Sequence, residues 1–135
     1  DPLTSYLDSS ILSSPKGIEV GSKNELGSFS LYDSCIKRTA KEAIQHFNKL
    51  LTVSDFKNGL SQLAELSDIM INRWLNSEDI ANEMKQYSIL QLANFKDFIP
   101  ATVETEWRKG LDTNEYYLKL CGAGMGGMFL KYQLT

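Results

Sequence analysis

The sequence has few of the residues that small metal-bound or disulfide-bonded domains require. Its 135 residues include two cysteines, Cys35 and Cys121, and a single histidine, His46. The cysteines lie far apart in the chain and neither has a CxxC partner, which excludes a disulfide framework and a structural zinc site. We therefore expect no intramolecular disulfide, no metal bound by this chain, and reduced thiols of the kind found in the cytoplasm.

Strongly basic segments and long apolar runs are absent as well. Lysine and arginine number 14 against 17 aspartate and glutamate residues, so nucleic acid and anionic membranes are poor candidate partners. No run approaches the ~18 apolar residues of a membrane span, and the first residues carry no secretory signal. With 42% hydrophobic and 23% charged residues, the composition is typical of a folded globular domain. We expect a cytoplasmic protein that binds neither membrane nor nucleic acid.

The spacing of apolar residues predicts a series of helices through the middle of the chain. The first has Ser30 as its N-cap and Asp33 in its first turn, and it continues to Leu51. The others are expected from Ser54 through Trp74, from Ser77 towards Phe98 with Pro100 as the stop, and over residues 101–109 with Gly110 as the end.

Strands are expected towards the two ends of the chain. Residues 5–10 have a short strand-like pattern, whereas residues 13–28 are rich in serine, glycine and lysine and contain Pro15, which favours a loop or an insertion. Residues 116–120 and 128–132 are aromatic and apolar enough for two further strands. The sequence therefore predicts an α+β fold in which a small antiparallel sheet is covered by helices.

Several chemically versatile side chains have simple structural interpretations. Cys35 falls on the apolar stripe of the first expected helix and is predicted to be a core residue, and His46 has no carboxylate nearby in sequence to orient it as a base. Cys121 has only Lys119 beside it to lower a thiol pKa, so a nucleophilic role is disfavoured. Core positions are expected for Trp74, Phe95, Phe98 and Trp107, helix-dipole positions for Glu78, Asp79 and Glu83, and solvated positions for Glu104 and Glu106.

The feature with the clearest chemistry is a glycine-rich loop, residues 121–127. Gly122, Gly124, Gly126 and Gly127 account for four of the nine glycines, with Ala123 and Met125 between them. Such a loop can turn sharply and bring backbone N–H groups against phosphate oxygens. The spacing satisfies GxGxxG, but a strand rather than a helix is expected to follow, which disfavours a dinucleotide site. A tight β-turn with a bulge remains the structural alternative.

The residues around this loop resemble a known family. Residues 119–128, Lys-Leu-Cys-Gly-Ala-Gly-Met-Gly-Gly-Met, resemble the third signature motif of the GHMP small-molecule kinases. Residues 95–100 and 107–111 look like the C-terminal part of the mevalonate kinase branch, particularly its bacterial members. Residues 6–10 stand where such enzymes have a strand that ends in Asp-Thr-Gly. Met125 interrupts the glycines of the family pattern, and Cys121 replaces a Thr or Ser hydroxyl.

The resemblance implies that residues 1–135 form the ferredoxin-like C-terminal domain of a GHMP kinase, a fragment that lacks the N-terminal nucleotide-binding domain. The absence of a starting methionine fits that interpretation. The full-length enzyme would use ATP and Mg²⁺ to phosphorylate mevalonate or a related hydroxylated metabolite, with its Gly-Leu-Gly-Ser-Ser loop and its catalytic Asp and Lys in the other domain.

In this fragment, Gly122, Ala123, Gly124, Met125, Gly126 and Gly127 would form a nucleotide-phosphate loop, with no catalytic residue and no metal ligand. We expect the fragment alone to be inactive and to bind no cofactor firmly, and we expect replacement of Gly124 or Gly126 to weaken ATP use rather than the fold. The alternative is a noncatalytic binding or interaction domain that retains the GHMP kinase C-terminal fold.

Overall fold

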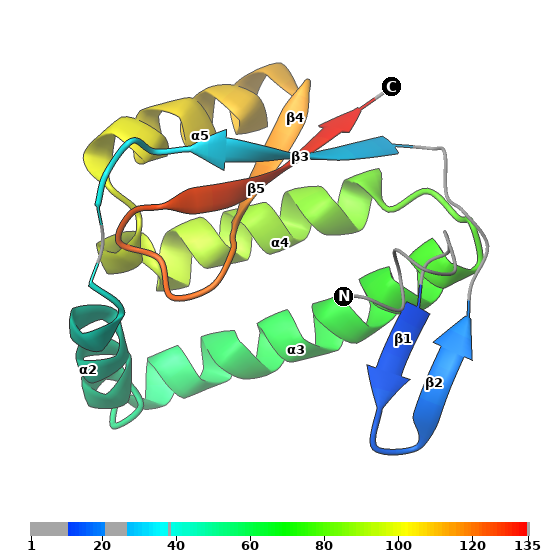
Figure 1. Ribbon diagram of the computed structural model, residues 1–135, viewed down its shortest axis with the longest axis horizontal. Helices are drawn as coiled ribbons and strands as arrows, with labels where there is room; N and C mark the ends of the chain where they lie inside the picture. Colours follow the sequence, from blue (N-terminus) through cyan, green and yellow to red (C-terminus); the bar gives the residue numbers. More distant parts are fainter. Residues whose placement is uncertain (1–10, 21–26, 38, 135) are drawn as a thin grey trace.

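The computed structural model describes residues 11–20, 27–37 and 39–134. Within these ranges the chain is α+β, as the sequence predicts, and Figure 1 shows a small sheet with helices on both of its faces. The expected strand over residues 5–10 lies outside the described residues. The strands are β1 (Ile11–Ser14), β2 (Gly17–Val20), β3 (Gly27–Asp33), β4 (Tyr116–Leu120) and β5 (Met128–Leu134), and the helices are α2 (Ala40–Leu50), α3 (Ser54–Leu75), α4 (Ala81–Asn94), η1 (Lys96–Phe98) and α5 (Ala101–Thr113).

The main sheet is antiparallel and has the strand order β3-β5-β4. Successive side chains of a strand point to opposite faces, so the central strand β5 contributes to two hydrophobic layers. Phe129 packs edge-on against Trp107 of α5 on one face, at a ring-centroid distance of 6.2 Å. Tyr132 points to the other face, where it belongs to a cluster with Met70 of α3 and Met84 of α4. The sheet therefore lies between α5 and the α3–α4 pair (Figure 1).

The prediction that the first helix begins at Ser30 is wrong. Residues 27–33 form β3, which pairs with all seven residues of β5, and the first described helix begins at Ala40. The local sequence carried a strand signal, because Ser28 and Ser30 alternate with Phe29 and Leu31. The apolar spacing of Leu31 and Cys35 coincides with a helical repeat, but the ladder to β5 decides the conformation. Cys35 is consequently exposed rather than part of the core.

The prediction of a loop over residues 13–28 is also wrong in part. β1 and β2 form an antiparallel hairpin in which Ser14 pairs with Gly17 across Pro15 and Lys16. Proline at the second position and glycine at the fourth position of a tight turn are the residues that such a turn favours. Gly17 adopts a φ of +127°, which explains the choice of glycine at that position.

The later helices agree with the sequence in their existence and differ at their ends. α3 extends over Ser54–Leu75 as expected, whereas α4 ends at Asn94 and is followed by the short turn η1 before Pro100. α5 continues through Gly110 and ends at Asn114, which has a left-handed φ of +56°. Gly110 therefore does not end the helix. A β-carbon there would lie 2.5 Å from the Tyr116 ring, so its glycine permits close packing between α5 and β4.

The aromatic residues confirm the predicted core in part. Trp107 and Phe98 are fully buried, whereas Trp74 and Phe95 are half-buried at the edges of their clusters. Among the described residues, no helix has both the length and the apolar character needed to cross a membrane.

Candidate functional site

The glycine loop connects β4 to β5, so it joins two paired antiparallel strands as the sequence predicts. Positive φ angles occur at Gly122 (+90°), Gly124 (+75°), Met125 (+61°), Gly126 (+136°) and Gly127 (+69°). Residues with side chains rarely adopt such angles, which explains the density of glycine. Met125 is the exception, and its side chain is half-buried against the core rather than free in solvent.

Neighbouring segments hold the loop tightly. The Met125 N–H donates to the Phe98 carbonyl at 2.6 Å, and the Gly127 N–H donates to the Ile36 carbonyl at 2.9 Å. A β-carbon on Gly124 would lie 2.9 Å from the Phe98 β-carbon, and one on Gly126 would lie 2.6 Å from the Ile36 carbonyl oxygen. The loop is therefore fixed between η1 and the segment that follows β3. These contacts give Gly124 and Gly126 a structural role whatever the loop binds.

Four further amides of the loop make no hydrogen bond that is described, and two of them, those of Gly122 and Ala123, are accessible to a ligand. The N–H groups of Gly122, Ala123, Gly124 and Gly126 donate to no acceptor in the described part of the chain. Gly122 is exposed and Ala123 is half-buried, whereas the two later glycines are buried. Successive amides in a loop with left-handed residues form a concave donor set suited to anions, and buried amides normally find a partner. Phosphate oxygens match this donor set, whereas N–H groups cannot act as ligands to Mg²⁺.

The end of β4, which leads into the loop, is hydrogen-bonded to α4. Gln91 is buried, and its side-chain oxygen accepts a hydrogen bond of 2.9 Å from the Leu120 N–H. Lys119 directly precedes Leu120, and burial lowers the pKa of its ammonium group. Its ammonium donates to the Leu120 carbonyl at 3.2 Å and lies 5.4 Å from the centre of the Tyr87 ring. Cys121, the next residue, is an exposed free thiol.

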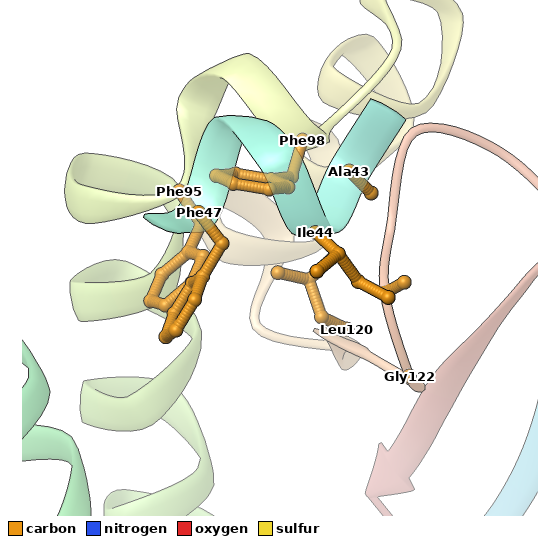
Figure 2. A pocket seen from close by; sticks show the side chains of 8 residues that line it. Ala43, Ile44, Phe47, Phe95, Phe98, Leu120 and Gly122 are labelled. Atoms are coloured by element: carbon orange, nitrogen blue, oxygen red, sulfur yellow. The ribbon is translucent and has the colours of Figure 1, made fainter. Parts of the chain in front are cut away.

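An apolar pocket of about 170 Å³ lies directly beside the loop. Its walls come from α2, from the segment around η1, from the end of β4 and from the first loop residues, and Figure 2 shows the side chains surrounding a common space. None of the lining side chains is charged. The lining residues are Ala43, Ile44, Phe47, Phe95, Phe98, Leu120, Gly122 and Ala123.

A histidine–carboxylate pair that the sequence did not reveal stands next to this pocket. His46 Nε2 lies 2.9 Å from Asp97 Oδ2, and the imidazole packs against the Phe98 ring at a centroid distance of 5.3 Å. The pair joins α2 to η1. The sequence did not indicate this partner for His46, because Asp97 lies 51 positions away and no local pattern connects the two residues.

Four of the acidic residues singled out in the sequence have interaction partners within the chain. Arg73 lies within 3.5 Å of Glu78 and 3.4 Å of Glu83, and no group of metal-ligating side chains occurs among the residues that the structure describes. Glu104 accepts from Arg108 at 2.7 Å, and Glu106 accepts from the Tyr116 hydroxyl. The Arg108 hydrogen bond lowers the pKa of Glu104. Both glutamates are partly exposed, and each also has a hydrogen-bond partner within the chain.

No protein-family model, curated protein sequence or solved structure matches this chain. The features of the chain that bear on its function are therefore the loop, the pocket and the resemblance of residues 119–128.

Proposed function

We propose that this chain is the ferredoxin-like C-terminal domain of an ATP-dependent GHMP-type kinase, and that its glycine loop approaches the nucleotide phosphates. The observation that carries the proposal is the combination of the signature-like residues 119–128 with four loop amides that have no acceptor in the described chain. The strand–loop–strand setting supports this proposal over a dinucleotide fold, in which a helix follows the glycines.

Phosphoryl transfer requires little covalent participation by the protein, so positioning and charge stabilisation supply most of the catalysis. In this proposal the amides of Gly122 and Ala123 donate to phosphate oxygens and stabilise negative charge that increases during transfer. Mg²⁺, when bound in the complete enzyme, neutralises charge on the phosphates. The catalytic Asp and Lys belong to the N-terminal domain, and the acceptor is a small hydroxylated metabolite, with mevalonate the first choice.

The position of Met125 is compatible with phosphate binding by the loop. Its side chain packs against the hydrophobic cluster around Phe98 and Leu120, and its N–H is already used by the Phe98 carbonyl. The departure from the family pattern therefore leaves Gly122 and Ala123 unobstructed by this side chain.

The test is ADP release from ATP and mevalonate, measured for the 135-residue chain and for the complete protein encoded by its reading frame. We expect turnover by the complete protein and none by the 135-residue chain. In that protein, Gly122→Val should lower kcat/KM on the order of tenfold, or about 1.4 kcal/mol, because a side chain there covers the neighbouring amides. Gly17→Val, another positive-φ glycine far from the loop in sequence, is the matched control.

Turnover by the 135-residue chain near the ~10 s⁻¹ median of enzymes would contradict the domain assignment. Absence of ATP use by the complete protein would favour a noncatalytic binding or interaction domain with the same fold. Full activity of the Gly122→Val protein would leave the loop as a tight turn only.

A further inference from the structure

The pocket beside the glycine loop has the properties of a seat for part of a small molecule. We infer that it binds an uncharged, apolar part of the phosphoryl acceptor, an aliphatic group or a single ring. The inference rests on the proposed function, because the loop gives the acceptor its phosphoryl donor. It adds a class of substrate: an amphiphilic alcohol whose apolar end enters the pocket and whose hydroxyl faces the loop.

The size of the pocket sets the size of the group. Its volume is about 170 Å³. An apolar cavity of roughly 150 Å³ lined by leucine, isoleucine and phenylalanine stays dry and holds a benzene molecule. A branched aliphatic chain or a single ring is therefore of a size that fills this pocket, and a larger ligand would extend through its open side.

The chemistry of the walls sets the polarity of the group. Phe47, Phe95 and Phe98 provide aromatic surface, and Ile44 and Leu120 provide aliphatic surface (Figure 2). A carboxylate or phosphate inside such walls would lose its hydration without gaining a charged partner, which is strongly unfavourable. Charged parts of the acceptor must therefore remain outside the pocket.

The position of the pocket links it to the proposed reaction. Gly122 and Ala123 line the pocket and also carry two of the loop amides that are available to phosphate. A hydroxyl attacks productively only when it lies about 3–3.5 Å from the phosphorus atom, so the acceptor must adjoin the phosphate loop. A molecule that binds in this pocket would have its free end beside the loop, where the phosphates are proposed to lie.

Helix α2 supplies the wall that determines specificity. Ile44 lines the pocket while remaining 55% exposed, so a bound apolar group would cover a side chain that otherwise faces water. The His46–Asp97 pair joins this helix to η1, one residue from each of the lining residues Phe47 and Phe98. Ile44 is the position at which a substitution should change binding with the least effect on folding.

The experiment is an NMR titration of the 135-residue chain with 3-methylbutan-1-ol, compared with glycerol, which has hydroxyl groups but no apolar end. We expect saturable shifts at Ile44, Ala43 and Ala123 with 3-methylbutan-1-ol and none with glycerol. Ile44→Trp should fill the pocket and weaken alcohol binding at least tenfold. Ile69→Trp, at an isoleucine on α3 with a similar exposure of 52%, should leave binding unchanged.

Each outcome bears on one of the two proposals. No saturable binding of 3-methylbutan-1-ol, equal binding of glycerol, or equal effects of the two tryptophan variants would overturn the pocket inference. If the complete protein nevertheless loses activity with Gly122→Val, the kinase proposal stands. Alcohol binding by a protein that uses no ATP would overturn the assignment of the pocket to a phosphoryl acceptor together with the kinase proposal. Preserved NMR dispersion of both variants verifies that they fold.

Discussion

At Gly124 the backbone comes so close to Phe98 that a side chain cannot fit without movement of the loop. Phe98 supplies both the β-carbon and the carbonyl oxygen that a new β-carbon would meet, at 2.9 Å and 3.0 Å. The same carbonyl accepts the Met125 N–H, so it cannot shift without weakening that hydrogen bond. The contacts therefore predict a loss of stability at this position, in addition to any effect on ATP use.

Gly124→Ala should lower the free energy of unfolding of the 135-residue chain by about 2–4 kcal/mol, from left-handed strain and overpacking together. Gly17→Ala, at a φ of +127° with no atom within 4 Å of the added carbon, isolates the conformational part and should cost about 1–2 kcal/mol. Urea unfolding measures both values. Equal losses in the two variants would show that the contact with Phe98 is unimportant.

Helix α2 is attached to the rest of the molecule mainly by its apolar side chains. Ala43 is buried, and the Phe47 ring lies 5.6 Å from Phe56 of α3 and 6.4 Å from Phe95, centre to centre. The ion pair between His46 and Asp97 is more exposed, with 34% and 65% of the two side chains accessible. Exposed pairs contribute little because water screens them, so the aromatic contacts should dominate.

Phe47→Ala should therefore cost about 2–3 kcal/mol, less than the ~3–5 kcal/mol of a fully buried phenylalanine, and should speed hydrogen exchange in α2 before it affects the sheet. His46→Ala should cost no more than about 1 kcal/mol. Hydrogen exchange followed by NMR distinguishes opening of α2 from opening of the sheet. A larger effect from His46→Ala than from Phe47→Ala would contradict this ranking.

Tyrosine burial couples the stability of the whole molecule to alkaline pH. Burial is the main cause that raises the pKa of Tyr87, Tyr116, Tyr117 and Tyr132 above the ordinary value of about 10. The acidic Glu106 raises the Tyr116 pKa further, and Asp79 and Glu83 raise that of Tyr132. The folded state therefore favours the neutral phenols. Their contribution is fully present below the unfolded pKa and is lost as pH rises through the higher folded values.

We expect the free energy of unfolding to fall between about pH 10 and pH 12, with phenolate absorbance increasing together with loss of helix. Tyr132→Phe should reduce this pH dependence at little cost near neutrality, because the Tyr132 hydroxyl is buried without a hydrogen-bond partner among the described residues. Tyr116→Phe instead removes the hydrogen bond to Glu106. Ultraviolet titration of folded and urea-unfolded chain measures the effect, and identical titration curves would contradict it.

The sequence by itself determined the elements whose signals are local. Helix α3 follows from an apolar stripe over many turns, and the β4–loop–β5 unit follows from two short apolar segments around clustered glycines. The loop residues of the candidate site, from Gly122 to Gly127, could therefore be identified before the fold was known. The Pro15 turn and the alternation from Ser28 to Leu31 are local signals too. The first is typical of a hairpin turn and the second of a strand.

Tertiary structure decided the features that depend on distant residues. β3 is a strand because β5, about a hundred positions later, supplies its hydrogen-bond partners. Gly110 lies within α5 rather than after its end, although glycine near a helix end is locally ambiguous. The Tyr116 ring occupies the space that a side chain on this residue would need. The His46–Asp97 pair and the pocket likewise join α2, η1 and the glycine loop. Local propensities amount to at most about 1 kcal/mol per residue, so burial and strand pairing override them wherever distant segments meet.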